Sequence, residues 1–200
     1  MVARHRVFIE GGGDTRDQQL RCREAFHSLF SKCGFGGRMP RLVACGGRGA
    51  AFDDFKIALR NGDGGFIALL VDSEDPVVDT ERPWEHLQVR DKWECPDGAT
   101  EDHALLMTTC METWIVADID AITRALGNSV ITGRLPVTDL ESRSRQDVLN
   151  ALQDATKPTR TPYAKGRVSF QFLARVDPDV LRVKLPSFDR AIRILDEQLN

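Results

Sequence analysis

The sequence predicts an α/β fold whose sheet is mostly parallel and flanked by helices. Short apolar runs alternate with longer amphipathic segments, and the runs end in glycine or acidic residues, as strand-to-helix turns do. Strands are expected at about 5–10, 40–45, 66–71 and 103–109. Helices are expected between them at about 16–33 and 49–61. This order is that of βαβ units, so neighbouring strands should run parallel.

The first predicted strand runs directly into Glu10, which three glycines at 11–13 follow. Glycine allows the backbone a tight turn there, and Asp14 or Thr15 is a suitable cap for the next helix. Apolar residues recur on one face of that helix: Cys22, Phe26, Leu29, Phe30 and Cys33. The glycines fit neither the GxGxxG nor the P-loop spacing. A carboxylate would also repel a pyrophosphate, so Glu10 is interpreted as a metal ligand or general base.

The third predicted strand, Phe66 to Val71, ends in Asp72-Ser73-Glu74-Asp75-Pro76. Open α/β sheets bind ligands at the carboxyl ends of their strands. Clustered hard oxygen ligands suit Mg²⁺ or Mn²⁺, which can position a phosphate. The pattern leaves open whether Glu74 or Asp75 is the second ligand. It is also compatible with a polar loop after a strand.

Two further residues are expected near this edge. Arg48 follows the second strand through Gly46-Gly47, where its cation could hold a substrate phosphate or form a salt bridge with Glu10 or Asp72. Glu112 lies in an apolar segment after the fourth strand. A charge in such a segment is costly unless it binds a metal or pairs, for instance with an arginine.

The second half of the chain predicts a helical extension at about 121–200, with amphipathic helices at 147–155 and 187–199. Between them, residues 155–170 contain no acid, and their prolines and glycine predict a loop. This basic loop carries candidate phosphate or base contacts: Lys157, Arg160, Lys165, Arg167 and the aromatic Tyr163. The alternative is a solvated loop. Residues 76–102, which contain Trp84 and Trp93, predict a long loop of functional interest.

Composition is ordinary for one globular domain over residues 1–200, with 42% hydrophobic residues and a net charge of −3. No apolar run is long enough to span a membrane, and no signal-peptide pattern begins the chain. The five cysteines are odd in number and lack a CxxC pair, so we expect reduced, mostly buried thiols and no zinc site. A cytoplasmic location is expected.

These residues carry a resemblance. A strand ending in Glu-Gly, followed by one ending in Asp-x-Asp or Asp-x-Glu, resembles the Toprim domain of topoisomerases, primases and several nucleases. The chain as a whole resembles an uncharacterised bacterial family, often encoded beside an ABC- or OLD-like ATPase in defence loci. The matching elements are Ile9–Asp14, Ala44–Arg48, Leu70–Glu74, Met111–Trp114 and Tyr163–Gly166. The Toprim part spans about residues 5–120, and Glu74 departs from its usual second aspartate.

The resemblance implies a Rossmann-like fold and a Mg²⁺- or Mn²⁺-dependent phosphodiesterase, most simply a nuclease acting on DNA or RNA. Glu10, Asp72, Glu74 and Glu112 would then bind metal and carry the chemistry, and an ATPase partner would control it. The alternative is a non-catalytic subunit of the same fold that docks on an ATPase. An aspartyl phosphohydrolase using Asp72 is a weaker third hypothesis, because the Asp-x-Asp-x-Thr pattern is absent.

Overall fold

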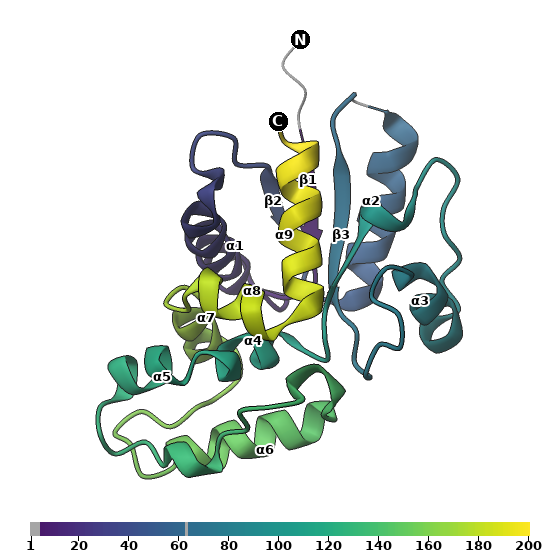
Figure 1. Ribbon diagram of the computed structural model, residues 1–200. Helices are drawn as coiled ribbons and strands as arrows, with labels where there is room; N and C mark the ends of the chain where they lie inside the picture. The colour runs from purple at the N-terminus through teal and green to yellow at the C-terminus, as the bar shows by residue number, and fades with distance from the viewer. Residues whose placement is uncertain (1–4, 63) are drawn as a thin grey trace.

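A four-stranded parallel sheet organises the part of the chain that the structure describes (Figure 1). The structure is a computed structural model that describes residues 5–62 and 64–200, except for the side chain of Arg167. The strands are β1 (Arg6–Ile9), β2 (Arg41–Ala44), β3 (Ile67–Asp72) and β4 (Ala104–Met107). Their order in the sheet is β2-β1-β3-β4, and each pair of neighbours is parallel. The predicted Rossmann-like α/β fold with a parallel sheet is therefore confirmed.

The two connections that leave β1 and β2 cross on opposite faces of the sheet. Helix α1 (Arg16–Phe30) leads from β1 to β2, and helix α2 (Arg48–Asn61) leads from β2 over β1 to β3. The two helices pack into separate hydrophobic clusters. The strand order therefore reverses between β1 and β3. In an open α/β sheet this is the topological switch point, where a crevice forms at the carboxyl ends.

Strand β3 is buried along its whole length because helices cover both of its faces. Ala68 and Leu70 belong to the cluster on the α1 face, whereas Ile67, Leu69 and Val71 belong to the cluster on the α2 face. This alternation is the period of two that a strand imposes. A continuous apolar run is what a strand buried on both faces requires.

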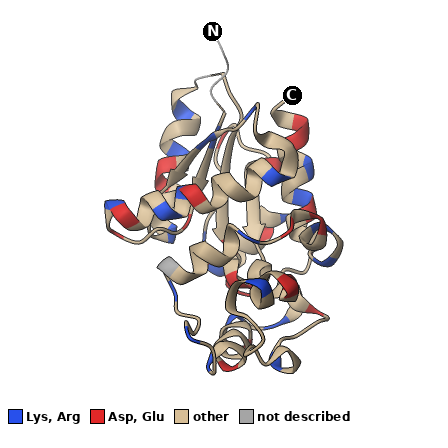
Figure 2. Ribbon diagram, turned by 90° about the vertical axis from the view of Figure 1, so that its left-hand side faces the viewer, with Lys and Arg blue, Asp and Glu red and all other residues tan. Residues whose placement is uncertain are grey.

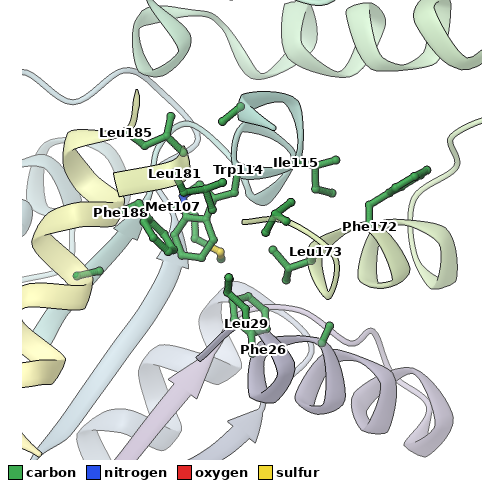
Figure 3. Close-up of a cluster of buried hydrophobic side chains, with 14 of the residues drawn as sticks. Phe26, Leu29, Met107, Trp114, Ile115, Phe172, Leu173, Leu181, Leu185 and Phe188 are labelled. Atoms are coloured by element: carbon green, nitrogen blue, oxygen red, sulfur yellow. The ribbon is translucent and has the colours of Figure 1, made fainter. Parts of the chain in front are cut away.

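The larger core lies on the α1 face and centres on Trp114, as Figure 3 shows. Trp114 belongs to α4 (Met111–Ala117), and its ring meets Phe188 at 4.8 Å and Phe26 at 6.3 Å between centroids. Phe188 comes from α9 (Pro186–Gln198), the last helix, and Phe26 comes from α1. This core therefore joins the two ends of the chain across one face of the sheet.

On the α2 face the structure corrects one prediction. Residues 76–102 do not form a long loop, because they contain the helix α3 (Pro83–Asp91). Pro83 stands at its first position, where a missing N–H costs no hydrogen bond. Trp84 is buried, and Trp93 stacks on Phe52 with ring centroids 4.2 Å apart. Both tryptophans therefore pack in the smaller core.

The second half of the chain is helical, as expected. It contains α5 (Ile119–Leu126), α6 (Arg145–Thr156), α7 (Arg167–Leu173), α8 (Pro178–Lys184) and α9. Short helical turns lie at Ser31–Phe35, Glu101–His103, Thr132–Arg134 and Leu140–Ser142. Helices α5 and α6 lie beyond the carboxyl ends of the strands, whereas α9 runs along the sheet (Figure 1). The extension therefore reaches the edge where the candidate site residues end their strands.

Arg190 attaches α9 to the outer edge of the sheet. This guanidinium is 5% exposed and donates to the carbonyls of Ala104 at 3.1 Å and Glu101 at 3.0 Å. It also pairs with Glu81 at 3.2 Å. A buried charge needs such partners, and here they fix the last helix against the start of β4.

The charged residues and the cysteines are placed as expected for a globular domain with reduced thiols. Basic and acidic residues are interspersed along most helices (Figure 2). All five cysteines are free; Cys22 and Cys110 are buried, whereas Cys33 and Cys45 are half-buried. Burial raises the pKa of these four thiols to about 12, so they remain protonated. Across the described residues, no helix combines the length and apolar character that crossing a membrane requires.

Candidate functional site

Three carboxylates meet at the topological switch point. One carboxylate oxygen each from Glu10, Asp72 and Glu74 lies within 4.8 Å of the other two. Glu10 follows β1, Asp72 is the last residue of β3, and Glu74 comes two residues later. We call these three residues the acidic cluster. The sequence predicted that these three residues would converge together with Glu112, because parallel strands end at one edge of the sheet.

Glycines hold Glu10 in position. The N–H groups of Gly11 and Gly46 each donate to the other's carbonyl, at 2.8 and 2.9 Å, which joins the turns after β1 and β2. A Cβ at Gly12 would lie 2.8 Å from the Cα of Gln19, closer than real Cβ atoms approach backbone. The turn therefore needs glycine at that position to bring α1 this close. Glu10 in turn accepts a hydrogen bond from the Asp72 N–H at 3.1 Å.

Asp72 is the most buried member of the cluster. It is 8% exposed, and Oδ1 accepts a hydrogen bond from the Met111 N–H at 2.8 Å. Within the described part of the chain, this is the only hydrogen bond that its carboxylate accepts. Burial and the charges of Glu10 and Glu112 raise the pKa of Asp72 well above its usual value, against the opposing effect of Arg145. Burial also raises the pKa of Glu10, although Arg48 opposes this.

The structure distinguishes Glu74 from Asp75. Glu74 adopts a left-handed backbone with φ of 68°, and its N–H donates to the Thr109 carbonyl at 2.8 Å. This turn directs the Glu74 carboxylate into the cluster. The Asp75 side chain is 68% exposed and pairs with Arg90 at 3.3 Å. Glu74 is therefore the second ligand candidate after Asp72.

Arg48 forms salt bridges, which is the alternative that the sequence left open. Its guanidinium contacts Asp91 through two hydrogen bonds, of 3.0 and 2.6 Å, and Glu10 through one of 3.1 Å. It also donates to the Asp72 carbonyl and lies 4.9 Å from the ring centroid of Trp93. Asp91 was not predicted as a partner, because α3 was not expected.

Arg145 is a site residue that was not predicted from the sequence. This residue begins α6, and its guanidinium forms an ion pair with Glu74. Nothing in the local sequence distinguishes it from the other basic residues of the extension. Only the fold, which places the first turn of α6 at the acidic cluster, identifies it.

Glu112 lies outside the acidic cluster and has a different partner. It is 4% exposed, and the Tyr163 hydroxyl donates to its Oε1 at 2.5 Å. Glu112 was predicted to bind metal, with an arginine partner as the alternative; its partner in the structure is a tyrosine. Burial and the neighbouring Glu112 carboxylate raise the pKa of Tyr163 strongly. The charge of Glu112 nevertheless reaches Asp72, since it contributes to the raised pKa of that residue.

The basic loop is shorter than predicted, and its aromatic residue is not available for stacking. Helix α6 continues to Thr156, and α7 begins at Arg167, so the loop covers residues 157–166. Tyr163 is 5% exposed instead of open to solvent. Lys157, Arg160 and Lys165 are exposed and form no ion pair within the described residues. The side chain of Arg167 lies outside the described part of the chain.

A family model described as Domain of unknown function (DUF4276) matches residues 9–196. The chain belongs to the DUF4276 family. The match contains the whole acidic cluster, Arg48, Glu112 and the basic loop. It does not link the DUF4276 chain to the Toprim domain or to ATPase-neighbouring loci. Searches of curated proteins and of solved structures find no match.

Proposed function

We propose that this DUF4276 protein is a metal-dependent phosphodiesterase, and specifically a nuclease with a Toprim-type site. The observation that carries the proposal is the convergence of Glu10, Asp72 and Glu74 within 4.8 Å at the switch point. Asp72 also supports a metal site. Its carboxylate is nearly buried, and one of its oxygens accepts no hydrogen bond within the described chain. A cation would relieve the repulsion in such a cluster.

The donor set fits a hard divalent cation. Carboxylate oxygens are the ligands that Mg²⁺ and Mn²⁺ prefer. Asp72 and Glu74 would hold the ion, and Glu10, whose pKa is raised, would hold or move a proton next to it. When bound, the ion stabilises charge on the phosphate and lowers the pKa of the attacking water. Glu112 remains paired with Tyr163 and adds negative charge beside Asp72.

Exposed cations support a nucleic-acid substrate. Lys157, Arg160 and Lys165 lie on the loop that follows α6, the helix whose first residue contacts Glu74. Free surface cations of this kind neutralise backbone phosphates, of either DNA or RNA. An ATPase partner that controls cleavage in a cytoplasmic defence system is proposed from the resemblance alone.

One observation favours the alternative, a non-catalytic docking subunit. Arg48 and Arg145 already pair with Glu10 and Glu74, so part of the cluster is neutralised without a metal. If these ion pairs are purely structural, the protein has no need of a divalent cation.

Calorimetric titration with Mn²⁺ separates the two functions. We expect the wild-type protein to bind Mn²⁺ and Asp72→Asn to lose the binding, because the nearly isosteric amide removes the charge. Asp75→Asn is the matched control: it removes the adjacent exposed carboxylate and should leave affinity within about twofold. Absence of Mn²⁺ binding by the wild type would overturn the metal-dependent function and leave the docking alternative standing.

A second experiment addresses the substrate. Replacing Lys157, Arg160 and Lys165 together by Gln should weaken binding to DNA or RNA while leaving Mn²⁺ affinity intact. The slope of log affinity against log salt should fall by about 0.7–0.9 for each lost phosphate contact. Asp72→Asn should do the opposite, abolishing divalent-dependent cleavage while largely preserving nucleic-acid binding. An unchanged salt slope in the triple variant would exclude this loop as the phosphate-binding surface.

A further inference from the structure

Three arginines contact the acidic cluster: Arg48 pairs with Glu10, whereas Arg145 and, more distantly at 3.9 Å, Arg90 pair with Glu74. Arg90 is also bound by Asp75 and Asp91, so Arg48 and Arg145 are the two to compare, and they are held very differently. Arg48 donates to two oxygens of Asp91, to Glu10 and to the Asp72 carbonyl, and its side chain is 14% exposed. Arg145 has one hydrogen-bond partner within the described residues, Glu74, and its side chain is 32% exposed. Moving Arg48 would break four hydrogen bonds, whereas moving Arg145 breaks only the contact with Glu74.

The position of Arg145 suits a second partner. It is the first residue of α6, a helix capped by the Ser144 hydroxyl, which accepts from the Asp147 N–H at 3.1 Å. The amino end of a helix carries a partial positive charge that favours anions. A guanidinium at this end can bind a phosphate through two parallel hydrogen bonds. In Figure 1, α6 lies beyond the carboxyl ends of the strands, where a substrate would approach the cluster.

We infer that Arg145 is an exchangeable cation, which pairs with Glu74 in the metal-free protein and binds a substrate phosphate once Glu74 coordinates a divalent ion. The inference rests on the proposed function and assigns Arg145 to its substrate-binding step. The reason for exchange is competition, because Arg145 pairs with the Glu74 carboxylate that the ion would coordinate. Arg48 stays in place and keeps Glu10 oriented.

The first test measures metal affinity. Arg145→Gln removes the competing cation, so Mn²⁺ should bind about two- to fivefold more tightly than to the wild type, the range expected for a partly exposed ion pair. Arg143→Gln is the matched control. Arg143 belongs to the same extension and donates to the Thr138 carbonyl, with no carboxylate partner in the described chain. Its replacement should leave Mn²⁺ affinity unchanged.

The second test measures binding to phosphorothioate-linked single-stranded DNA and the matching RNA, which resist cleavage. In EDTA, Arg145→Gln should bind like the wild type, because Arg145 is then engaged with Glu74. In Mn²⁺, it should bind several-fold more weakly than the wild type. A purely structural ion pair, or a simple loss of one positive charge, would not make the difference depend on the metal.

The outcomes separate this inference from the proposed function. Equal Mn²⁺ affinity in Arg145→Gln and Arg143→Gln, with loss of binding in Asp72→Asn, overturns the exchange and leaves the metal site standing. The exchange is also overturned if Arg145→Gln weakens nucleic-acid binding equally in EDTA and in Mn²⁺. A wild-type protein that binds no Mn²⁺ overturns the inference together with the proposed function.

Discussion

Two buried carboxylates at the carboxyl edge of the sheet have opposite surroundings. Glu112 is matched by one strong neutral donor, the Tyr163 hydroxyl at 2.5 Å. Asp72 lies among other acids, and within the described chain its carboxylate accepts only the Met111 N–H. Each carboxylate accepts one hydrogen bond within the described chain, but Asp72 also lies beside Glu10 and Glu74, and this crowding of negative charge favours a cation there. The difference distinguishes a carboxylate that stabilises the fold from one that is suited to binding a cation.

The largest expected effect comes from removing the hydrogen bond between Tyr163 and Glu112. Tyr163→Phe leaves Glu112 buried without its donor, which should lower the free energy of unfolding by about 1–3 kcal/mol. Urea denaturation measures the change. Glu112→Gln is the control, because the amide oxygen still accepts from Tyr163 and the loss should be smaller. An unchanged free energy of unfolding in Tyr163→Phe would show that Glu112 finds another partner. The difference drawn here between Glu112 and Asp72 would then be wrong.

Binding of a cation at the acidic cluster should stabilise the folded protein. Mn²⁺ at ten times its dissociation constant should raise the free energy of unfolding by about 1.4 kcal/mol, if it binds only the folded state. Thermal denaturation with and without the ion measures the increment. Tyr163→Phe should keep this increment and Asp72→Asn should lose it, because the ion acts on the acidic cluster alone.

Neutralising Asp72 without metal should also stabilise the protein. The pKa of Asp72 is raised in the folded state, so the unfolded chain loses this proton first as pH rises, and ionisation then costs the folded state free energy. The stability that the protonated group provides is present below the unfolded pKa and lost as pH rises through the folded pKa. Asp72→Asn in EDTA should therefore match the wild type in acid and exceed it at pH 7. A gain of about 1 kcal/mol would raise Tm by about 2–4 °C. A lower Tm at pH 7 would show that Asp72 is satisfied as a carboxylate.

The smallest effect is expected at Asp75. Its exposed carboxylate pairs with Arg90 at 3.3 Å, and Arg90 in turn lies 3.9 Å from Glu74. Asp75→Asn should change the free energy of unfolding by less than about 0.5 kcal/mol, with or without Mn²⁺. A Mn²⁺-dependent effect at Asp75 would mean that this residue acts on the cluster, either directly or through Arg90.

The strand ends were predictable because their pattern is local. An apolar run followed by Glu10 and glycines, or by Asp72, indicates both the strand and the edge at which its side chain lies. The choice of Glu74 over Asp75 was not predictable, since it depends on a left-handed turn stabilised by the Thr109 carbonyl. Helix α3 was missed because prolines and acids obscured its short apolar face.

The partners of the site residues depend on tertiary structure. Tyr163 lies 51 residues after Glu112, and Arg145 lies 71 residues after Glu74. Neither spacing has a periodicity that sequence reasoning could use. Its place in a basic loop suggested that Tyr163 is exposed to solvent. In the structure its ring is buried and its hydroxyl donates to Glu112.

The guanidinium of Arg190 has a consequence for association between molecules. Strand β4 ends the sheet, and Met107 directs its carbonyl inward to the Ser73 N–H. Alternation along the strand therefore turns the Ala104 carbonyl toward the open side, where Arg190 occupies it. An unpaired strand edge invites a strand from another chain, and such pairing leads to aggregation. A second molecule that added a strand here would have to expel a buried charge and detach α9, so this edge is protected against β-sheet extension.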